Sequence, residues 1–223
     1  PDGHQKQFRV DFDNKSLRSE LPDGNQYPDW SQLDFNQCLN CPLTSEDYLY
    51  CPLAVNLVPI IYWCKDLVSY DEVDVVITSA EREVRARTSL QRAISSLLGL
   101  LMSSSDCPKT KFLRPLARFH LPLATHEETI FRAVSATFLK EYFNDNGNKI
   151  NKDPLGELKQ QYQELQNINR FIAERIRNAI KRDAAVNAIV LLDVLSKKVS
   201  FSIDDSLQEI RYLFENKDES DVA

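Results

Sequence analysis

The chain has 223 residues and a formal net charge of −6, with 43% hydrophobic and 27% charged residues. This composition is ordinary for a soluble globular protein, and the chain is long enough to bury a sizeable core. The negative charge argues against nonspecific binding to nucleic acid or to an anionic membrane, because both need clustered lysine and arginine. No apolar run approaches the ~20 residues of a membrane-spanning helix, and the N-terminal PDGHQKQFRV has no signal-peptide core. We therefore expect a cytoplasmic protein that binds neither nucleic acid nor a membrane.

The first half of the chain contains three strand-like segments. Residues 6–12 alternate apolar and polar side chains, with the apolar positions at Phe8, Val10 and Phe12. Residues 72–78 and 83–88 predict a hairpin that is closed by the short S-A-E-R segment. Together these segments predict a small antiparallel sheet of about three strands.

Helical spacing of apolar residues predicts helices over 53–68 and 89–104 in the same half. Pro59 is expected to kink or interrupt the first of them, because proline removes one backbone hydrogen bond. A further helix is predicted from Thr125 to about residue 143. It opens with T-H-E-E, in which Thr125 and Glu128 are spaced for a capping box.

The last third of the chain predicts three helices, over residues 155–179, 184–199 and 203–215. Asp183 is predicted to cap the second helix, and Ser202 with Asp205 the third. The sequence thus predicts an α+β fold in which the small sheet packs on helices and a helical part follows. The predicted division is 1–150 for the α+β part and 151–223 for the helical part, packed as one unit.

Four of the five cysteines form the most informative pattern in the chain. Cys38 and Cys41 have the C-x2-C spacing with which two thiolates hold one metal ion. Cys41, Cys51 and Cys107 are each followed by proline, which keeps the cysteine backbone extended. An odd number of cysteines in a chain of this length favours thiols or metal over disulfides. The pattern predicts a closed site of four thiolates that joins two distant segments, formed by Cys38, Cys41, Cys51 and Cys107.

Structural zinc is the expected ion, because four cysteines around one ion are typical of structural zinc sites. A 4Fe–4S cluster on the same thiolates is the alternative. A third interpretation has no metal, since reduced cysteine often serves as a small buried hydrophobic residue. Cys64 lies in an apolar helical run and is interpreted as a core residue. Cys64 and His120 are the alternatives to Cys107 as the fourth ligand.

A second pattern is the segment R-P-L-A-R-F-H-L-P, which contains Arg114, Arg118 and His120 and is followed by Arg132. Arginines and a histidine before a helix N-terminus are suited to bind an anion such as phosphate or a carboxylate. The alternative is a structural network of ion pairs, and we favour it in an acidic protein.

Several catalytic chemistries have no support in the sequence. The chain has five glycines and contains neither G-x-G-x-x-G nor a Walker loop. It has no G-x-S-x-G motif. Its three histidines are too few for a histidine-rich catalytic metal centre.

The segments Q-C-L-N-C-P-L, Y-C-P-L-A and D-C-P-K-T-K-F-L-R-P-L-A-R-F-H-L-P resemble an uncharacterised bacterial family described as a domain of unknown function. The resemblance extends to N-A-I-V-L-L-D-V-L near the C-terminus. It implies a bacterial cytoplasmic protein in which the cysteine segments are a defining element. It implies no activity, substrate or catalytic residue.

Because no catalytic constellation is assembled, we expect a non-enzymatic interaction or regulatory module with a structural zinc site. A protein partner or a second copy of the chain is expected to bind the amphipathic C-terminal helices. The second hypothesis is an iron–sulfur redox or sensory protein. The third is an enzyme that acts on an anionic substrate through Arg114, Arg118, His120 and Glu127.

Overall fold

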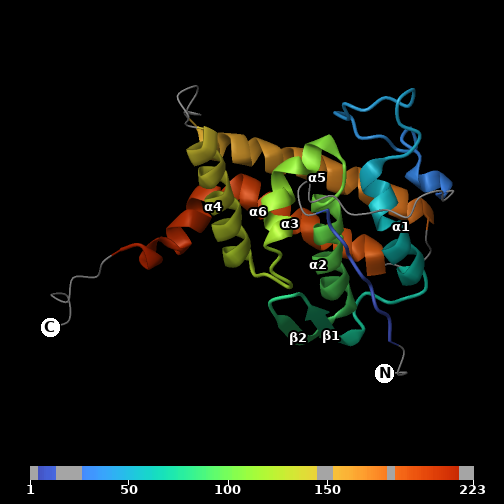
Figure 1. Ribbon diagram of the computed structural model, residues 1–223, viewed down its shortest axis with the longest axis horizontal. Coiled ribbons are helices and arrows are strands. Elements are labelled where there is room, and N and C mark those ends of the chain that lie inside the picture. Colours follow the sequence, from blue (N-terminus) through green and yellow to red (C-terminus); the bar gives the residue numbers. More distant parts are fainter. Residues whose placement is uncertain (1–4, 14–26, 145–152, 180–183, 216–223) are drawn as a thin grey trace.

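The computed structural model describes residues 5–13, 27–144, 153–179 and 184–215. The described chain is mainly helical and carries one β-hairpin at its edge, which is a mixed α+β architecture (Figure 1). No helix in these ranges is long and apolar enough to cross a membrane.

The predicted hairpin is confirmed. β1 (Glu72–Thr78) pairs antiparallel with β2 (Glu83–Ser89), with Glu72 opposite Ser89 and Thr78 opposite Glu83. Alternate residues of β1 are half-buried, and the others are exposed. The hairpin contacts α2 (Leu90–Ser103), which follows β2 directly. The alternation along β1 therefore serves to cover one end of this helix.

The predicted third strand is wrong, because the sheet of the described residues has only β1 and β2. Phe8, Val10 and Phe12 are half-buried as their alternation predicts, and their neighbours are exposed. However, the ring of Phe8 packs edge-on against Trp63 at 5.3 Å between centroids, and Trp63 belongs to α1 (Pro52–Cys64). The apolar face of the segment is thus buried on a helix.

The sequence patterns also predict the other helices of the first half of the chain. α1 begins at Pro52 and continues through Pro59, so the proline does not interrupt it. α4 (His126–Asn144) starts at the predicted capping box. The Thr125 N–H donates to Glu128 Oε2 at 2.7 Å, and the Glu128 N–H donates to Thr125 Oγ1 at 3.2 Å.

The C-terminal part contains two long helices, α5 (Pro154–Ala179) and α6 (Ala184–Glu209), and a short 3-10 turn, η3 (Arg211–Leu213). The predicted break at Ser202 does not occur. Val199 and Ile203 are both fully buried, and they share one face of α6 at i and i+4. Continuing the helix buries both side chains on the same core. The predicted cap Asp183 lies outside the described residues.

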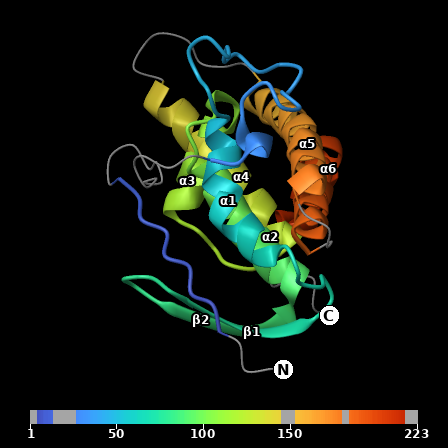
Figure 2. The ribbon, with the colours of Figure 1, turned by 90° about the vertical axis from the view of Figure 1, so that its right-hand side faces the viewer.

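One hydrophobic core runs through both parts of the chain. α6 packs along α5 and also contacts α2 and α4, as the two ribbon views show (Figures 1 and 2). The core cluster includes Leu33 and Leu57 from the first part together with Ile172 and Ile203 from the second. The predicted division at residue 150 falls between 145 and 152, outside the described residues.

Candidate metal centre

Cys38 and Cys41 lie at the two ends of a tight turn. The Cys41 N–H donates to the Cys38 carbonyl at 3.0 Å, which closes the turn. Gln37 Nε2 donates to the Leu43 carbonyl at 2.9 Å and braces the loop around it. A tight turn of this kind is the backbone arrangement in which a C-x2-C pair can supply two ligands to one ion.

Cys51 is held beside this turn by a short stretch of antiparallel pairing. The Cys51 N–H donates to the Ser31 carbonyl at 2.8 Å, and the Leu33 N–H donates to the Leu49 carbonyl at 3.0 Å. Cys51 is buried and is the N-cap residue of α1.

Cys107 comes from a different part of the chain, at the start of the 3-10 helix η2 (Pro108–Leu113). Two buried hydroxyl groups brace its backbone. Thr110 Oγ1 donates to the Cys107 carbonyl at 3.2 Å, and the Cys107 N–H donates to Ser105 Oγ at 3.4 Å. The Ser105 and Thr110 hydroxyls also contact each other at 3.2 Å.

The four cysteines gather in one cluster, and the pKa values of Cys38 and Cys107 are shifted there. Burial, with smaller contributions from Cys51, Cys107 and Cys41, raises the pKa of the Cys38 thiol to about 12, and Arg175 opposes the rise. Burial also raises the pKa of Cys107 to about 11, with Cys51 and Cys41 adding to the rise. Hydrogen bonds from the backbone of Lys109 and Thr110 oppose that rise. The C-x2-C loop and the start of η2 therefore meet at these thiols.

Cys64 lies apart from the cluster, in the core as expected. Its side chain is fully buried in α1, and burial alone raises the pKa of its thiol to about 12, with no other cysteine contributing. His120 is likewise not among the groups that act on the four thiols. Of the three alternatives for a fourth ligand, Cys107 is the one that stands with Cys38, Cys41 and Cys51.

The thiols are clustered but not placed as ligands of one ion. Within the described ranges, no three His, Cys, Asp or Glu side chains form a group that could hold a metal. Sulfurs bound to one zinc ion lie about 3.8 Å apart, because each Zn–S bond is ~2.3 Å in a tetrahedral site. The four sulfurs must therefore draw together to share an ion.

A buried arginine that the sequence analysis did not assign to the site lies against the cluster. Arg175 of α5 is 1% exposed. Its Nη1 donates to the carbonyls of Trp30 and Gln32 at 2.8 and 2.6 Å, and its Nη2 donates to the Leu33 carbonyl at 2.9 Å. Its Nε is buried and has no hydrogen-bond partner in the described part of the chain.

Arg175 interacts electrostatically with the cysteine thiols. Burial lowers the pKa of the guanidinium, and Cys51, Cys38, Cys41 and Asp34 oppose that fall. The sequence does hold a signal for this residue, because Arg175 follows Ile172 by three positions on the inward stripe of a predicted helix. An inward arginine on such a stripe must find buried acceptors.

A family model described as "Domain of unknown function (DUF6901)" matches residues 1–215. The chain belongs to this family. The match spans the cysteine segments and both long C-terminal helices, and it confirms the resemblance noted from the sequence. No curated protein and no solved structure matches the chain.

Most side chains of the second predicted site make contacts within the protein. This site comprises Arg114, Arg118, His120 and Arg132. Arg132 Nη2 donates to the carbonyls of Leu116 and Phe119, both at 2.7 Å, and so ties α4 to α3 (Arg114–Arg118). Arg114 pairs with Asp106 at 3.4 Å. Arg118 is exposed, with its guanidinium 5.5 Å from the centre of the Phe119 ring. These contacts support the structural interpretation of the segment.

His120 generates a prediction about pH. Burial, and then the nearby Arg132, lower the pKa of its imidazole to about 4, whereas an unfolded histidine titrates near 6.5. Between pH 6.5 and pH 4, His120 is therefore protonated in the unfolded chain and neutral in the folded chain. The free energy of unfolding falls as the pH falls through this window. We expect His120 to account for about 2 kcal/mol of lost stability between pH 7 and pH 5.

Urea unfolding of the wild type and of His120→Gln at both pH values measures this contribution. The variant should lose less stability on acidification than the wild type. An equal loss in the two proteins would show that His120 is not the group responsible.

Proposed function

We propose that the protein is a non-enzymatic interaction or regulatory module whose cysteine cluster holds a structural zinc ion through Cys38, Cys41, Cys51 and Cys107. The observation that carries the proposal is Arg175. Its hydrogen bonds go to neutral carbonyls, and the thiols are among the few groups that favour its positive charge.

The charges of the cluster support a bound cation. A buried guanidinium is costly unless an anion compensates it. Protonated thiols offer no such anion, and the pKa of Cys38 near 12 keeps that thiol protonated at neutral pH without a cation. A divalent zinc ion with four thiolates carries a net charge of −2, which the guanidinium reduces to −1. Arg175 is thus complementary to the metal-loaded cluster and poorly matched to the metal-free one.

The same donor set favours a structural role over a catalytic one. Four thiolates close the tetrahedral coordination of zinc, so no position remains for water or substrate. Such an ion would join the loop that carries Cys38, Cys41 and Cys51 to the start of η2 at Cys107. A 4Fe–4S cluster on the same thiolates is the second occupant to test.

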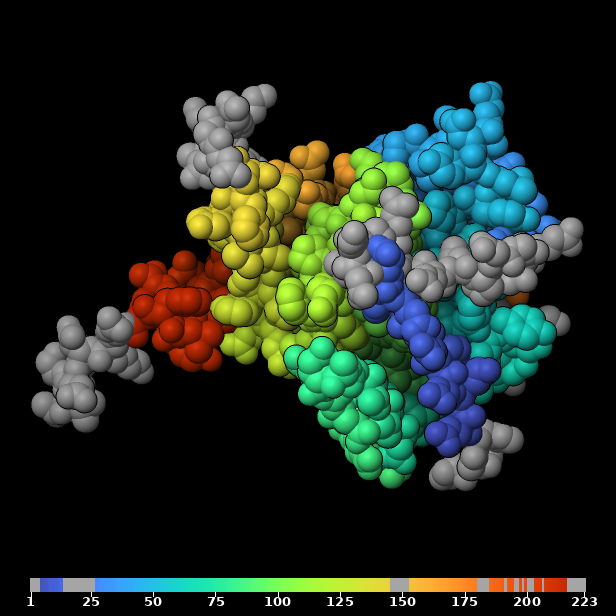
Figure 3. All heavy atoms as spheres, viewed as in Figure 1, coloured from blue at the N-terminus to red at the C-terminus, as the bar shows by residue number. Residues whose placement is uncertain are grey.

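Exposed apolar residues support the interaction role. Phe131, Phe138 and Tyr142 share one face of α4 at i, i+7 and i+11, and they are 44, 50 and 74% exposed. Tyr212, Leu213 and Phe214 at the end of the described chain are also exposed. Figure 3 shows α4 on the molecular surface, with the C-terminal end of α6 projecting beside it. Exposed apolar side chains that share one helix face are typical of interaction sites, and we propose a second copy of the chain as the partner.

The metal is tested by elemental analysis and a visible spectrum of protein purified without chelator. We expect one zinc ion per chain and no visible absorbance. Cys107→Ser and Cys41→Ser should each lower the zinc content, whereas Cys64→Ala, outside the cluster, should retain it. A brown preparation that contains iron would replace zinc with the cluster, and protein with neither metal would refute both.

The role of Arg175 is tested by competition with a chromophoric zinc chelator. Arg175→Met removes the compensating charge and should weaken zinc binding by about tenfold or more, since a 1.4 kcal/mol loss corresponds to a factor of ten. Arg175→Lys keeps the charge and should recover part of the affinity. Equal affinities in folded Arg175→Met and wild type would contradict the proposed charge compensation.

The partner surface is tested by sedimentation velocity. The wild type should self-associate, and the double variant Phe138→Ser/Tyr142→Ser should sediment as a monomer, because it removes the apolar area that drives association. The matched control is Tyr62→Ser/Tyr70→Ser, which changes two exposed side chains outside α4 and outside the cysteine cluster. A monomeric wild type would rule out the proposed homodimer.

A further inference from the structure

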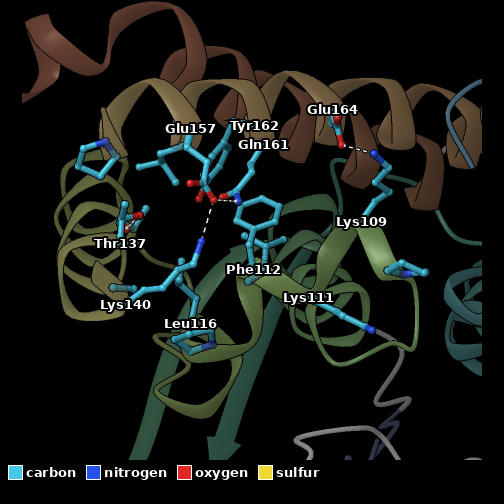
Figure 4. Close-up of a pocket in the computed structure, with 17 residues that line it drawn as sticks. Lys109, Lys111, Phe112, Leu116, Thr137, Lys140, Glu157, Gln161, Tyr162 and Glu164 are labelled. Atoms are coloured by element: carbon cyan, nitrogen blue, oxygen red, sulfur yellow. Dashed lines mark hydrogen bonds and ion pairs between the residues drawn. The ribbon is translucent and has the colours of Figure 1, made fainter. Parts of the chain in front are cut away.

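A cleft of about 480 Å³ lies between η2, α3, α4 and α5 (Figure 4). Its volume is within the range of about 300–1,000 Å³ that is typical of small-molecule sites. No motif of the sequence indicated this cleft, and none of the four thiols of the cysteine cluster lines it.

The floor of the cleft is apolar. Phe112 packs edge-on against Tyr162 with 5.5 Å between ring centroids, and Leu116 and Leu158 continue the same lining. Tyr162 is 4% exposed, and burial raises the pKa of its hydroxyl, so this group stays neutral. From α4, Ala136 adds only a methyl group to the lining. The floor therefore favours an apolar ligand, because binding removes apolar surface of both partners from water.

A carboxylate neutralises each lysine that lies inside the cleft. Lys140 Nζ donates to Glu157 Oε1 at 2.7 Å, and Lys109 Nζ donates to Glu164 Oε2 at 2.8 Å. Figure 4 shows these two ion pairs on either side of Phe112. Each pair combines one positive and one negative charge, so neither side of the apolar floor carries a net charge.

The third lysine of the lining does not change this balance. Lys111 is exposed, and Figure 4 shows its side chain pointing away from the cleft. Among the described residues, the lining includes no arginine, histidine or aspartate. The charged groups that face the cleft are therefore balanced.

The two ion pairs disfavour a charged ligand of either sign. An anion has to compete for Lys109 or Lys140 with a glutamate that already accepts from it, and a cation has to displace one of these lysines. In both cases the ligand loses hydration without meeting an unpaired group of opposite charge, and burying such a charge is costly. An uncharged ligand avoids this cost and leaves both pairs intact.

We propose that this cleft binds an uncharged, mainly apolar small molecule. Its apolar body lies on Phe112, Leu116 and Leu158, between the two ion pairs. A neutral polar group on the ligand can hydrogen-bond to either pair without breaking it, because an ammonium has three donors and a carboxylate has several acceptor sites. The inference goes beyond the zinc proposal and does not depend on it.

The test is a fluorescence titration of the full chain at neutral pH with three compounds that share a naphthalene ring. Naphthylmethanol is uncharged, the naphthylacetate anion carries a carboxylate, and naphthylmethylammonium is a cation. We expect naphthylmethanol to bind at one site per chain and at least about tenfold more tightly than either ion, a difference of ~1.4 kcal/mol. Absence of naphthylmethanol binding, or an ion that binds as tightly, overturns the proposal.

A variant that fills the cleft locates the site. Ala136→Phe places a ring in the open space and should abolish the binding of naphthylmethanol. Ala80→Phe is the matched control, because it adds the same ring at an exposed position between β1 and β2, outside the cleft lining. This control should bind naphthylmethanol as the wild type does.

A second variant tests why the cleft prefers an uncharged ligand. Glu164→Gln leaves Lys109 without its carboxylate and should strengthen the binding of naphthylacetate by about tenfold. Glu46→Gln removes the same charge from an exposed residue outside the lining and should leave that binding unchanged. Equal effects of the two variants, or no gain in folded Glu164→Gln, would contradict the role of the paired charges.

The variants decide the proposal even where one of them is unstable. Circular dichroism and the melting temperature show whether each variant is folded. If Ala136→Phe does not fold, Glu164→Gln against Glu46→Gln still separates a site in the cleft from attraction to the protein as a whole. Undiminished binding of naphthylmethanol to folded Ala136→Phe places the ligand elsewhere and overturns the inference.

Discussion

Arg175 holds the segment on which the cysteine cluster is built. Its guanidinium reaches from α5 to the carbonyls of Trp30, Gln32 and Leu33, more than 140 residues earlier in the chain. Without these donors the carbonyls would be left unsatisfied beside the core, which is costly. The same segment pairs with residues 49–51 and so fixes Cys51 at the start of α1. One side chain of the C-terminal part thus ties this N-terminal segment to α5, beside the core that both parts share.

Burial in the cluster disfavours two groups of opposite charge. Burial disfavours the thiolate at Cys38 and Cys107, and it also disfavours the cation at Arg175. Beside protonated thiols the buried guanidinium has only the charge of Asp34 to favour it, and thiolates without a cation repel one another. A divalent metal removes both costs together, since it turns thiols into thiolates and gives the guanidinium an anionic neighbour. The physical argument for a metal therefore rests on charge balance, which the C-x2-C spacing alone does not provide.

The sequence predicted what local signals determine. The alternation in 72–78 and the Thr125–Glu128 spacing act over a few residues, and the structure has the hairpin and the capping box where they indicate. The prediction of a third strand was wrong because Phe8 packs against Trp63, a distant helix residue that no local sequence pattern indicates. The predicted helix break at Ser202 was wrong because the burial of Val199 and Ile203 in one core outweighs the capping pattern of the sequence at this position. The role of Arg175 and the cleft arise from contacts between distant elements, which a single sequence does not display.

The short helix η2 connects the two sites physically. Cys107 immediately precedes it, and its residues Lys109 and Phe112 line the cleft. A second, much smaller cavity of about 20 Å³ lies beside Cys38, and the Lys109–Glu164 ion pair lines both cavities. Cys107 and Phe112 thus belong to one short segment that borders both the cysteine cluster and the cleft.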